Sequence, residues 1–112
     1  MSKILGGLLV AIAVATISWM QPAWAADPVL GAKVFNANCA ACHTGGMNMV
    51  VAPKNLKKET LKQYGMDSAE AIINQVTNGK GAMPSFKSKL SAEEIAGVAD
   101  YVLAQAEQGW TK

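Results

Sequence analysis

Cys39-Ala40-Ala41-Cys42-His43 is the stretch of sequence that decides the fold of this 112-residue chain. Two thiols stand three residues apart, and the only histidine of the protein follows the second thiol directly. On one helical turn, Cys39 and Cys42 share a face, and His43 projects from the same side. This spacing is typical of covalent c-type haem attachment, in which both sulfurs form thioethers and the imidazole takes an axial position on the iron.

A redox dithiol, a disulfide and half of a zinc site also use a Cys-X-X-Cys pair. A zinc site needs four ligands, whereas the chain has two cysteines, one histidine and scattered acidic residues. A thioredoxin-like dithiol belongs to an alternating βαβ pattern, which this sequence lacks. We therefore predict one covalent haem c, with Cys39 and Cys42 as thioether sites and His43 as an axial ligand of the iron.

The first 25 residues have the three parts of a secretory signal peptide. Met1-Ser2-Lys3 is a short positive start, Ile4 to Ile17 carries no charge, and Ala23-Trp24-Ala25 is an A-x-A cleavage site. We predict that residues 1–25 are cleaved and that residues 26–112 form one exported domain with a single haem. An uncleaved anchor is the alternative, because the apolar stretch is almost long enough to cross a bilayer if tilted.

The charge of the mature domain is close to balanced. Without Lys3, nine of the ten lysines remain, and the mature domain has eight acidic residues. Two haem propionates would bring the total near neutral, so the basic isoelectric point gives no reason to expect nucleic acid as a partner. We also expect no stable membrane insertion after signal cleavage, and a monomer or weak oligomer.

Helical patterns dominate the mature domain, and no convincing strand alternation is present. Asp27-Pro28 predicts a helix start, because an N-cap acceptor precedes a proline at the first helical position. Apolar residues then recur at helical spacing and lead into the haem motif. Residues 44–54 show no period, and Gly45-Gly46 predicts a loop there.

Three further helices are predicted after this loop. Gly65 ends a short one, and Asp67 or Ser68 caps the next, which stops at Asn78-Gly79. Ser91 and Glu94 form a capping box that opens the longest helix. The apolar positions expected on these helices are Leu56, Leu61 and Tyr64; Ala71, Ile72 and Val76; and Ile95, Val98, Tyr101 and Val102, with Gln105 beside them.

The second axial ligand decides what a haem here can do. With no second histidine, methionine, lysine, water or an open site remain. Met83 is the preferred candidate, because small residues precede it in the loop from 78 to 86 and Pro84 restricts it to an extended conformation. Methionine opposite histidine favours Fe(II), raises the potential and suits electron transfer.

The other methionines of the mature chain are weaker candidates. Met47 and Met49 follow His43 by four and six residues, which at about 3.3–3.6 Å per residue is barely enough chain to round the porphyrin rim. Met66 lies between Gly65 and the next helix start, where a packing role is sufficient explanation. It stays the alternative ligand.

The haem motif, the Gly45-Gly46 loop, the phrase from Gln75 to Pro84 and the final helix ending Asp100-Tyr101-Val102-Leu103 together resemble class I cytochromes c. They are most similar to the cytochrome c6 family of cyanobacteria and algal chloroplasts, over essentially the whole mature chain. The resemblance implies an all-α class I cytochrome c fold with four or five short helices around one haem. It also implies a one-electron carrier of the thylakoid lumen, not an enzyme, with the cytochrome b6f complex as donor and photosystem I as acceptor.

The resemblance carries individual roles as well. It makes Cys39 and Cys42 the thioether sites and His43 and Met83 the axial pair. Asn48 and Lys54 match positions that meet the haem propionates, and Gln75 matches a side chain near the haem edge that helps set the potential. The positions expected at the crossing of the first and last helices are Gly31, Phe35 and Tyr101.

Two alternatives to this function stay open. A related class I cytochrome of the lumen or periplasm would pass its electron to a terminal oxidase. A haem enzyme or sensor with an open sixth position would need distal histidine or arginine, and the chain has one histidine and no arginine.

Overall fold

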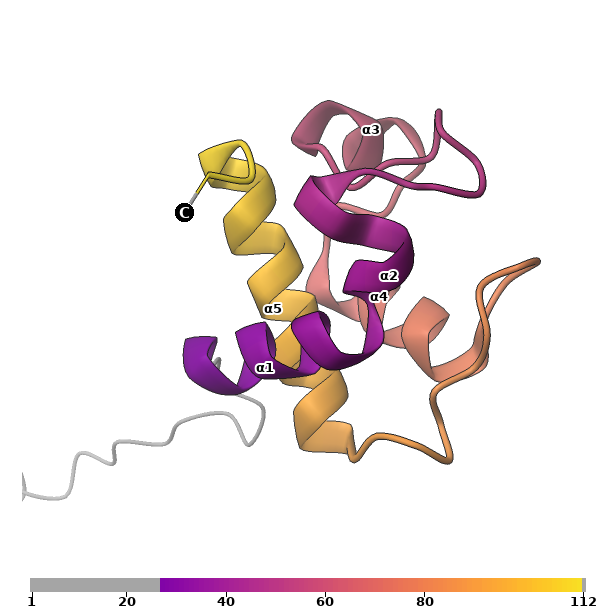
Figure 1. Ribbon diagram of the computed structural model, residues 1–112, viewed down its shortest axis with the longest axis vertical. Coiled ribbons are helices and arrows are strands. Elements are labelled where there is room, and N and C mark those ends of the chain that lie inside the picture. The colour runs from indigo at the N-terminus through magenta and orange to yellow at the C-terminus, as the bar shows by residue number, and fades with distance from the viewer. Residues whose placement is uncertain (1–26, 112) are drawn as a thin grey trace, which may run out of the picture.

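The computed structural model describes residues 27–111 (Figure 1), so the predicted signal peptide lies outside the described residues. In that part of the chain there is no strand, only an isolated bridge between Lys80 and Met83. The helical elements are α1 (Pro28–Asn38), α2 (Ala40–His43), the 3₁₀ turn η3 (Thr44–Gly46), α3 (Lys58–Gln63), α4 (Ala69–Asn78) and α5 (Ala92–Gln108). The prediction of an all-α fold is confirmed. None of the helices from 27 to 111 has the length and apolar character needed to span a bilayer.

The helix starts follow the capping residues read from the sequence. The Asp27 side chain accepts hydrogen bonds from two N–H groups of the first turn of α1, at 3.1 and 3.2 Å. Ser91 and Glu94 form the predicted capping box of α5, with bonds of 3.1 and 2.8 Å. For α4 the sequence left two candidates, and the structure selects Ser68.

Helix α3 is shorter than the sequence predicted from the spacing of Leu56, Leu61 and Tyr64. Leu56 precedes it and Tyr64 is its C-cap, so only Leu61 of the three lies inside the helix. Asn55 accepts a hydrogen bond from the N–H of Lys57 at 3.0 Å, and this local turn takes the backbone at Leu56 out of a helix. Leu61 is buried in the core, whereas Tyr64 is exposed.

The core is built around the crossing of α1 and α5 (Figure 1). Gly31 makes the crossing possible: a Cβ there would lie 2.8 Å from Cβ of Tyr101 and against the carbonyl oxygen of Gly97. Beside it, the rings of Phe35 and Tyr101 are 5.3 Å apart. The crossing implied by the resemblance is therefore present. The buried core residues are Val34, Phe35, Leu61, Ile72, Val76, Phe86, Ile95, Ala96, Val98, Ala99, Val102 and Ala106.

Replacing Gly31 with alanine should lower the free energy of unfolding by about 1–3 kcal/mol, because the added methyl group forces the two helices apart. Denaturant unfolding of the haem-loaded protein measures this change. Gly97→Ala is the matched control on the facing helix, since its new Cβ would meet no atom closer than 3.7 Å. An equal loss of stability in both variants would contradict the proposed close approach at Gly31.

Two long loops lie toward the right of the view, one above the other (Figure 1). The first, residues 47–57, follows η3, and the second, residues 79–91, joins α4 to α5. Apart from η3, the loop predicted for residues 44–54 is free of helix. These loops carry Asn48, Lys54 and Met83, whereas Gln75 lies on α4.

Candidate functional site

The two cysteines and the histidine lie on a single turn of helix, as their spacing predicts. Cys39 joins α1 to α2, and its carbonyl accepts hydrogen bonds from the N–H groups of Cys42 at 3.1 Å and His43 at 2.9 Å. Both thiols are free, Cys39 half-buried and Cys42 exposed. Burial, with the neighbouring Cys42 sulfur as a smaller cause, raises the pKa of the Cys39 thiol to about 11. Cys39 therefore stays a neutral thiol at physiological pH while it is free.

The imidazole of His43 is oriented by a backbone group. Its Nδ1 lies 2.9 Å from the carbonyl oxygen of Met47. A carbonyl can only accept, so Nδ1 carries the proton and Nε2 keeps a lone pair for a metal. Such outer hydrogen bonds fix the ring and make the ligating nitrogen more basic. Sequence reasoning missed this carbonyl, because no residue pattern marks a backbone acceptor.

Met83 is presented by a tight and well-anchored turn. Lys80 and Met83 exchange two backbone hydrogen bonds, at 2.9 and 3.0 Å, and Gly81 between them has φ +59°. After the turn, the Ser85 hydroxyl donates to the carbonyl of Thr77 at 2.5 Å, at the end of α4. Buried Phe86 extends this attachment with a backbone bond to α4. The half-buried Met83 side chain is therefore held against the core by its neighbours on both sides.

Gln75 and Met83 are brought together by this turn. The side-chain N–H of Gln75, on α4, donates a hydrogen bond to the Met83 sulfur at 3.5 Å. Cys39 packs against the same apolar core as Met83. Met66, the alternative ligand, is also a packing residue of that core, as its sequence position suggested.

Asn48 and Lys54 are joined to each other in the loop after η3. The Asn48 amide donates to the Lys54 carbonyl at 2.9 Å, and its oxygen accepts from the N–H groups of Val50 and Val51 at 2.9 and 2.8 Å. Asn48 therefore organises this loop. The Lys54 ammonium lies over the Tyr64 ring, 5.7 Å from its centroid.

The same loop exposes four apolar side chains on either side of Asn48, and the Met49 N–H donates to the carbonyl of Cys42 at 2.9 Å. Met49 is 67% exposed, Val50 61%, Met47 44% and Val51 41%. This much apolar surface on one short segment marks an interaction site. The free thiols, the oriented imidazole and this apolar segment together fit a covalently attached porphyrin.

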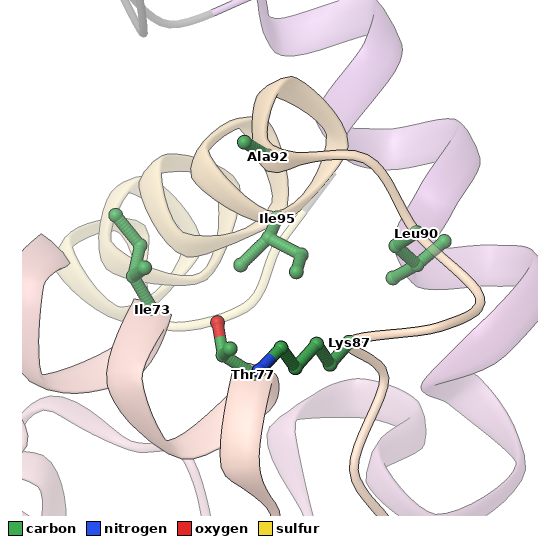
Figure 2. A pocket seen from close by; sticks show the side chains of 6 residues that line it. All are labelled: Ile73, Thr77, Lys87, Leu90, Ala92 and Ile95. Atoms are coloured by element: carbon green, nitrogen blue, oxygen red, sulfur yellow. The ribbon is translucent and has the colours of Figure 1, made fainter.

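A separate shallow depression of about 220 Å³ lies between α4 and the start of α5 (Figure 2). Ile73 from α4 and Ile95 from α5 point into it. None of the predicted site residues lines this depression, so it is distinct from the candidate haem site. Its lining consists of Ile73, Thr77, Lys87, Leu90, Ala92 and Ile95.

Known proteins match this chain along most of its length. Residues 26–102 match the family model described as "Cytochrome C oxidase, cbb3-type, subunit III". The cytochrome c6 of Nostoc sp. is 57% identical over 110 residues, which cover 98% of this chain and 99% of that protein. The cytochrome c6 of Microcystis aeruginosa is 65% identical over 80 residues, 71% of this chain and 99% of that protein. The structure of cytochrome c6 from the diatom Phaeodactylum tricornutum matches with a TM-score of 0.74 at 57% identity, covering 75% of this chain and 99% of that one.

The helical fold and the cysteine pair before His43 define a class I c-type cytochrome with one covalently bound haem c. The two cysteines fit this haem attachment. The chain belongs to the cytochrome c6 family. Its members are electron carriers, not enzymes, so the open-site enzyme alternative is not supported.

Proposed function

We propose that this chain carries single electrons from the cytochrome b6f complex to photosystem I in the thylakoid lumen, after cleavage of residues 1–25. In this proposal Cys39 and Cys42 hold the porphyrin, and His43 and Met83 are the axial ligands. The haem iron, when bound, supplies a one-electron Fe(III)/Fe(II) couple. The route and the compartment rest on membership of the cytochrome c6 family.

The fixed setting of both proposed ligands is the observation that carries this proposal. His43 is held by the Met47 carbonyl at 2.9 Å, and Met83 by its closed turn and by Gln75. Ligands that are already positioned need little movement when the charge of the metal changes, and preorganised groups keep reorganisation small. The arrangement suits a carrier that must be oxidised and reduced repeatedly.

The exposed segment Met47 to Val51 is the proposed contact surface for both partners. Small apolar patches suit weak, transient encounters of electron-transfer proteins. Lysines near this segment steer the approach through long-range charge, which salt screens. Lys54 forms no ion pair in the described part of the chain and lies over the Tyr64 ring, whereas Lys58 is paired with Glu107 at 2.7 Å. That pair also raises the pKa of Lys58.

Flash-induced electron transfer to isolated photosystem I tests the route. We expect the reduced protein to re-reduce photosystem I rapidly, at a rate that falls as salt is added. The alternative acceptor is a terminal oxidase, which the match to a family described for an oxidase subunit favours. Rapid oxidation by the oxidase together with no measurable transfer to photosystem I would contradict the proposed route.

Gln75→Val should lower the midpoint potential. The Gln75 N–H draws electron density from the Met83 sulfur, which makes that sulfur a weaker donor and favours Fe(II). A hydrogen bond of about 1 kcal/mol corresponds to ~40 mV for a one-electron couple, and we expect a fall of this order. A redox titration of the haem-loaded protein measures it.

Thr77→Val is the control for Gln75→Val. Thr77 lies on the same helix and is half-buried, and it lines the depression between α4 and α5, which Met83 does not line. Its contact with the Met83 turn is through the backbone carbonyl, which valine keeps. Its replacement should leave the potential unchanged. A fall of the same size in both variants would show that general changes in α4, not the bond to sulfur, set the potential.

A further inference from the structure

Trp110 closes the C-terminal end of α5, and sequence reasoning assigned it no role. Its ring packs against Phe35 and Tyr101, with centroids 5.3 and 6.3 Å away. Its backbone has φ +63°, a left-handed conformation that residues other than glycine rarely adopt. Such a conformation persists only where surrounding contacts impose it.

Trp110 contacts two residues that follow the haem motif: Gly46, at the end of η3, and Leu56, in the loop after it. The indole N–H donates a hydrogen bond to the carbonyl of Leu56 at 2.9 Å, across 54 positions of sequence. The indole ring also covers Gly46 so closely that a Cβ there would lie 2.5 Å from ring atoms Cδ1 and Nε1. Gly46 and Leu56 are themselves joined, because the Leu56 N–H donates to the Gly46 carbonyl at 2.7 Å. We call Gly46, Leu56 and Trp110 the Trp110 clasp.

The Trp110 clasp borders the group that orients the axial histidine. Met47 follows Gly46 directly, and its carbonyl is the partner of His43 Nδ1. The Met47 side chain is 44% exposed, so its own packing contributes little to the position of this carbonyl. Gly46, in contrast, is buried. The Met47 N–H donates to the Thr44 carbonyl at 3.1 Å, and Trp110 covers Gly46 directly before it. The position of the Met47 carbonyl therefore depends on this turn together with how firmly Gly46 is held.

We propose that Trp110 is a positioning residue for His43: through the Trp110 clasp it keeps the Met47 carbonyl within hydrogen-bond distance of Nδ1. This deepens the proposed function and rests on its assignment of His43 as an axial ligand. A firm hydrogen bond at Nδ1 makes Nε2 a stronger donor, which favours Fe(III). Loosening the clasp should therefore raise the midpoint potential, a change opposite in sign to that expected for Gln75→Val.

Trp110→Phe tests this proposal, because it keeps an aromatic ring and removes the indole N–H. In the reduced, haem-loaded protein, NMR follows the exchange of the His43 ring proton with solvent. Loss of one hydrogen bond in the clasp should speed that exchange roughly tenfold. The midpoint potential should rise at the same time, while the absorption spectrum keeps its histidine and methionine signature.

Ile95→Val is the control for a general loss of stability. Ile95 is buried near the N-terminal end of the same helix, far along α5 from Trp110. This variant should leave the His43 proton and the potential as in the wild type. Equal acceleration in both variants, or no change in Trp110→Phe, would overturn the proposal. A wild-type spectrum without histidine ligation would overturn the ligand assignment and this proposal together.

The wild-type protein offers a second test that needs no variant. If the clasp and the histidine open as one unit, the indole proton of Trp110 and the ring proton of His43 should lose protection together as denaturant is added. Parallel protection curves would support the proposal. Early loss of the indole proton with full protection of the His43 proton would refute it.

Discussion

Replacing Met83 with alanine should convert the oxidised protein from a low-spin to a high-spin or water-ligated form and allow carbon monoxide to bind the reduced protein rapidly. Axial ligands set haem potentials over a range of about 0.8 V, so we expect the midpoint potential to fall on the order of 0.2 V. The physical reason is the loss of a soft sulfur ligand that favours Fe(II). Absorption spectra, carbon monoxide mixing and a redox titration measure these changes.

Met66→Ala is the matched control for Met83→Ala. Met66 is the alternative ligand from the sequence, and the structure places it among the side chains packed on the core. Its replacement should cost stability and leave spectrum and potential intact. Met83→His should keep a low-spin spectrum at a lower potential, because an imidazole replaces the sulfur. A low-spin methionine spectrum that survives Met83→Ala and vanishes in Met66→Ala would reverse the assignment.

Preventing haem attachment should have the largest effect on structure. The double variant Cys39→Ala, Cys42→Ala cannot form either thioether, and we expect it to lose most of its far-ultraviolet helical signal. The proposed mature chain, residues 26–112, has 87 residues and buries only a modest core, and chains of this size commonly need a cofactor or other cross-link. Three of the buried apolar residues are alanines, which contribute little apolar area: Ala96, Ala99 and Ala106.

Met83→Ala separates the two effects of the haem. It keeps both thioethers, so it should retain helical circular dichroism although its axial ligand is gone. The exposed run from Met47 to Val51 is the part of the chain that we expect to gain order from the porphyrin. A haem-free double variant with native helix content and cooperative unfolding would contradict the structural role proposed for the haem.

Local signals in the sequence predicted the helices well, because caps and turns depend on neighbouring residues. The Asp27 cap and the Ser91 capping box are present, and Gly79, which ends α4, has φ +76°. The sequence could not decide between Asp67 and Ser68, since both side chains can cap a helix. Only the course of the backbone shows that Ser68 is the N-cap of α4. The boundary of α3 was missed for a related reason: an apolar residue such as Leu56 can pack from a turn as well as from a helix.

Long-range contacts of the site were less predictable. The spacing of Cys39, Cys42 and His43 specified one helical turn, and the structure has that turn. Sequence reasoning also singled out Met83, but only the resemblance placed Gln75 beside the haem. The hydrogen bond from Gln75 to the Met83 sulfur joins α4 to the turn after it, and no local pattern predicts such a contact. The Met47 carbonyl and Trp110 were missed altogether. One is a backbone group without a sequence signature, and the other acts through residues 54 and 64 positions away.

A spectroelectrochemical titration of the wild-type, haem-loaded protein tests whether it is a one-electron carrier with His43 and Met83 as axial ligands. We expect one reversible one-electron step at a clearly positive potential, with a low-spin histidine and methionine spectrum in both oxidation states. A high-spin spectrum in either state, or a negative potential typical of an iron without a sulfur ligand, would contradict it.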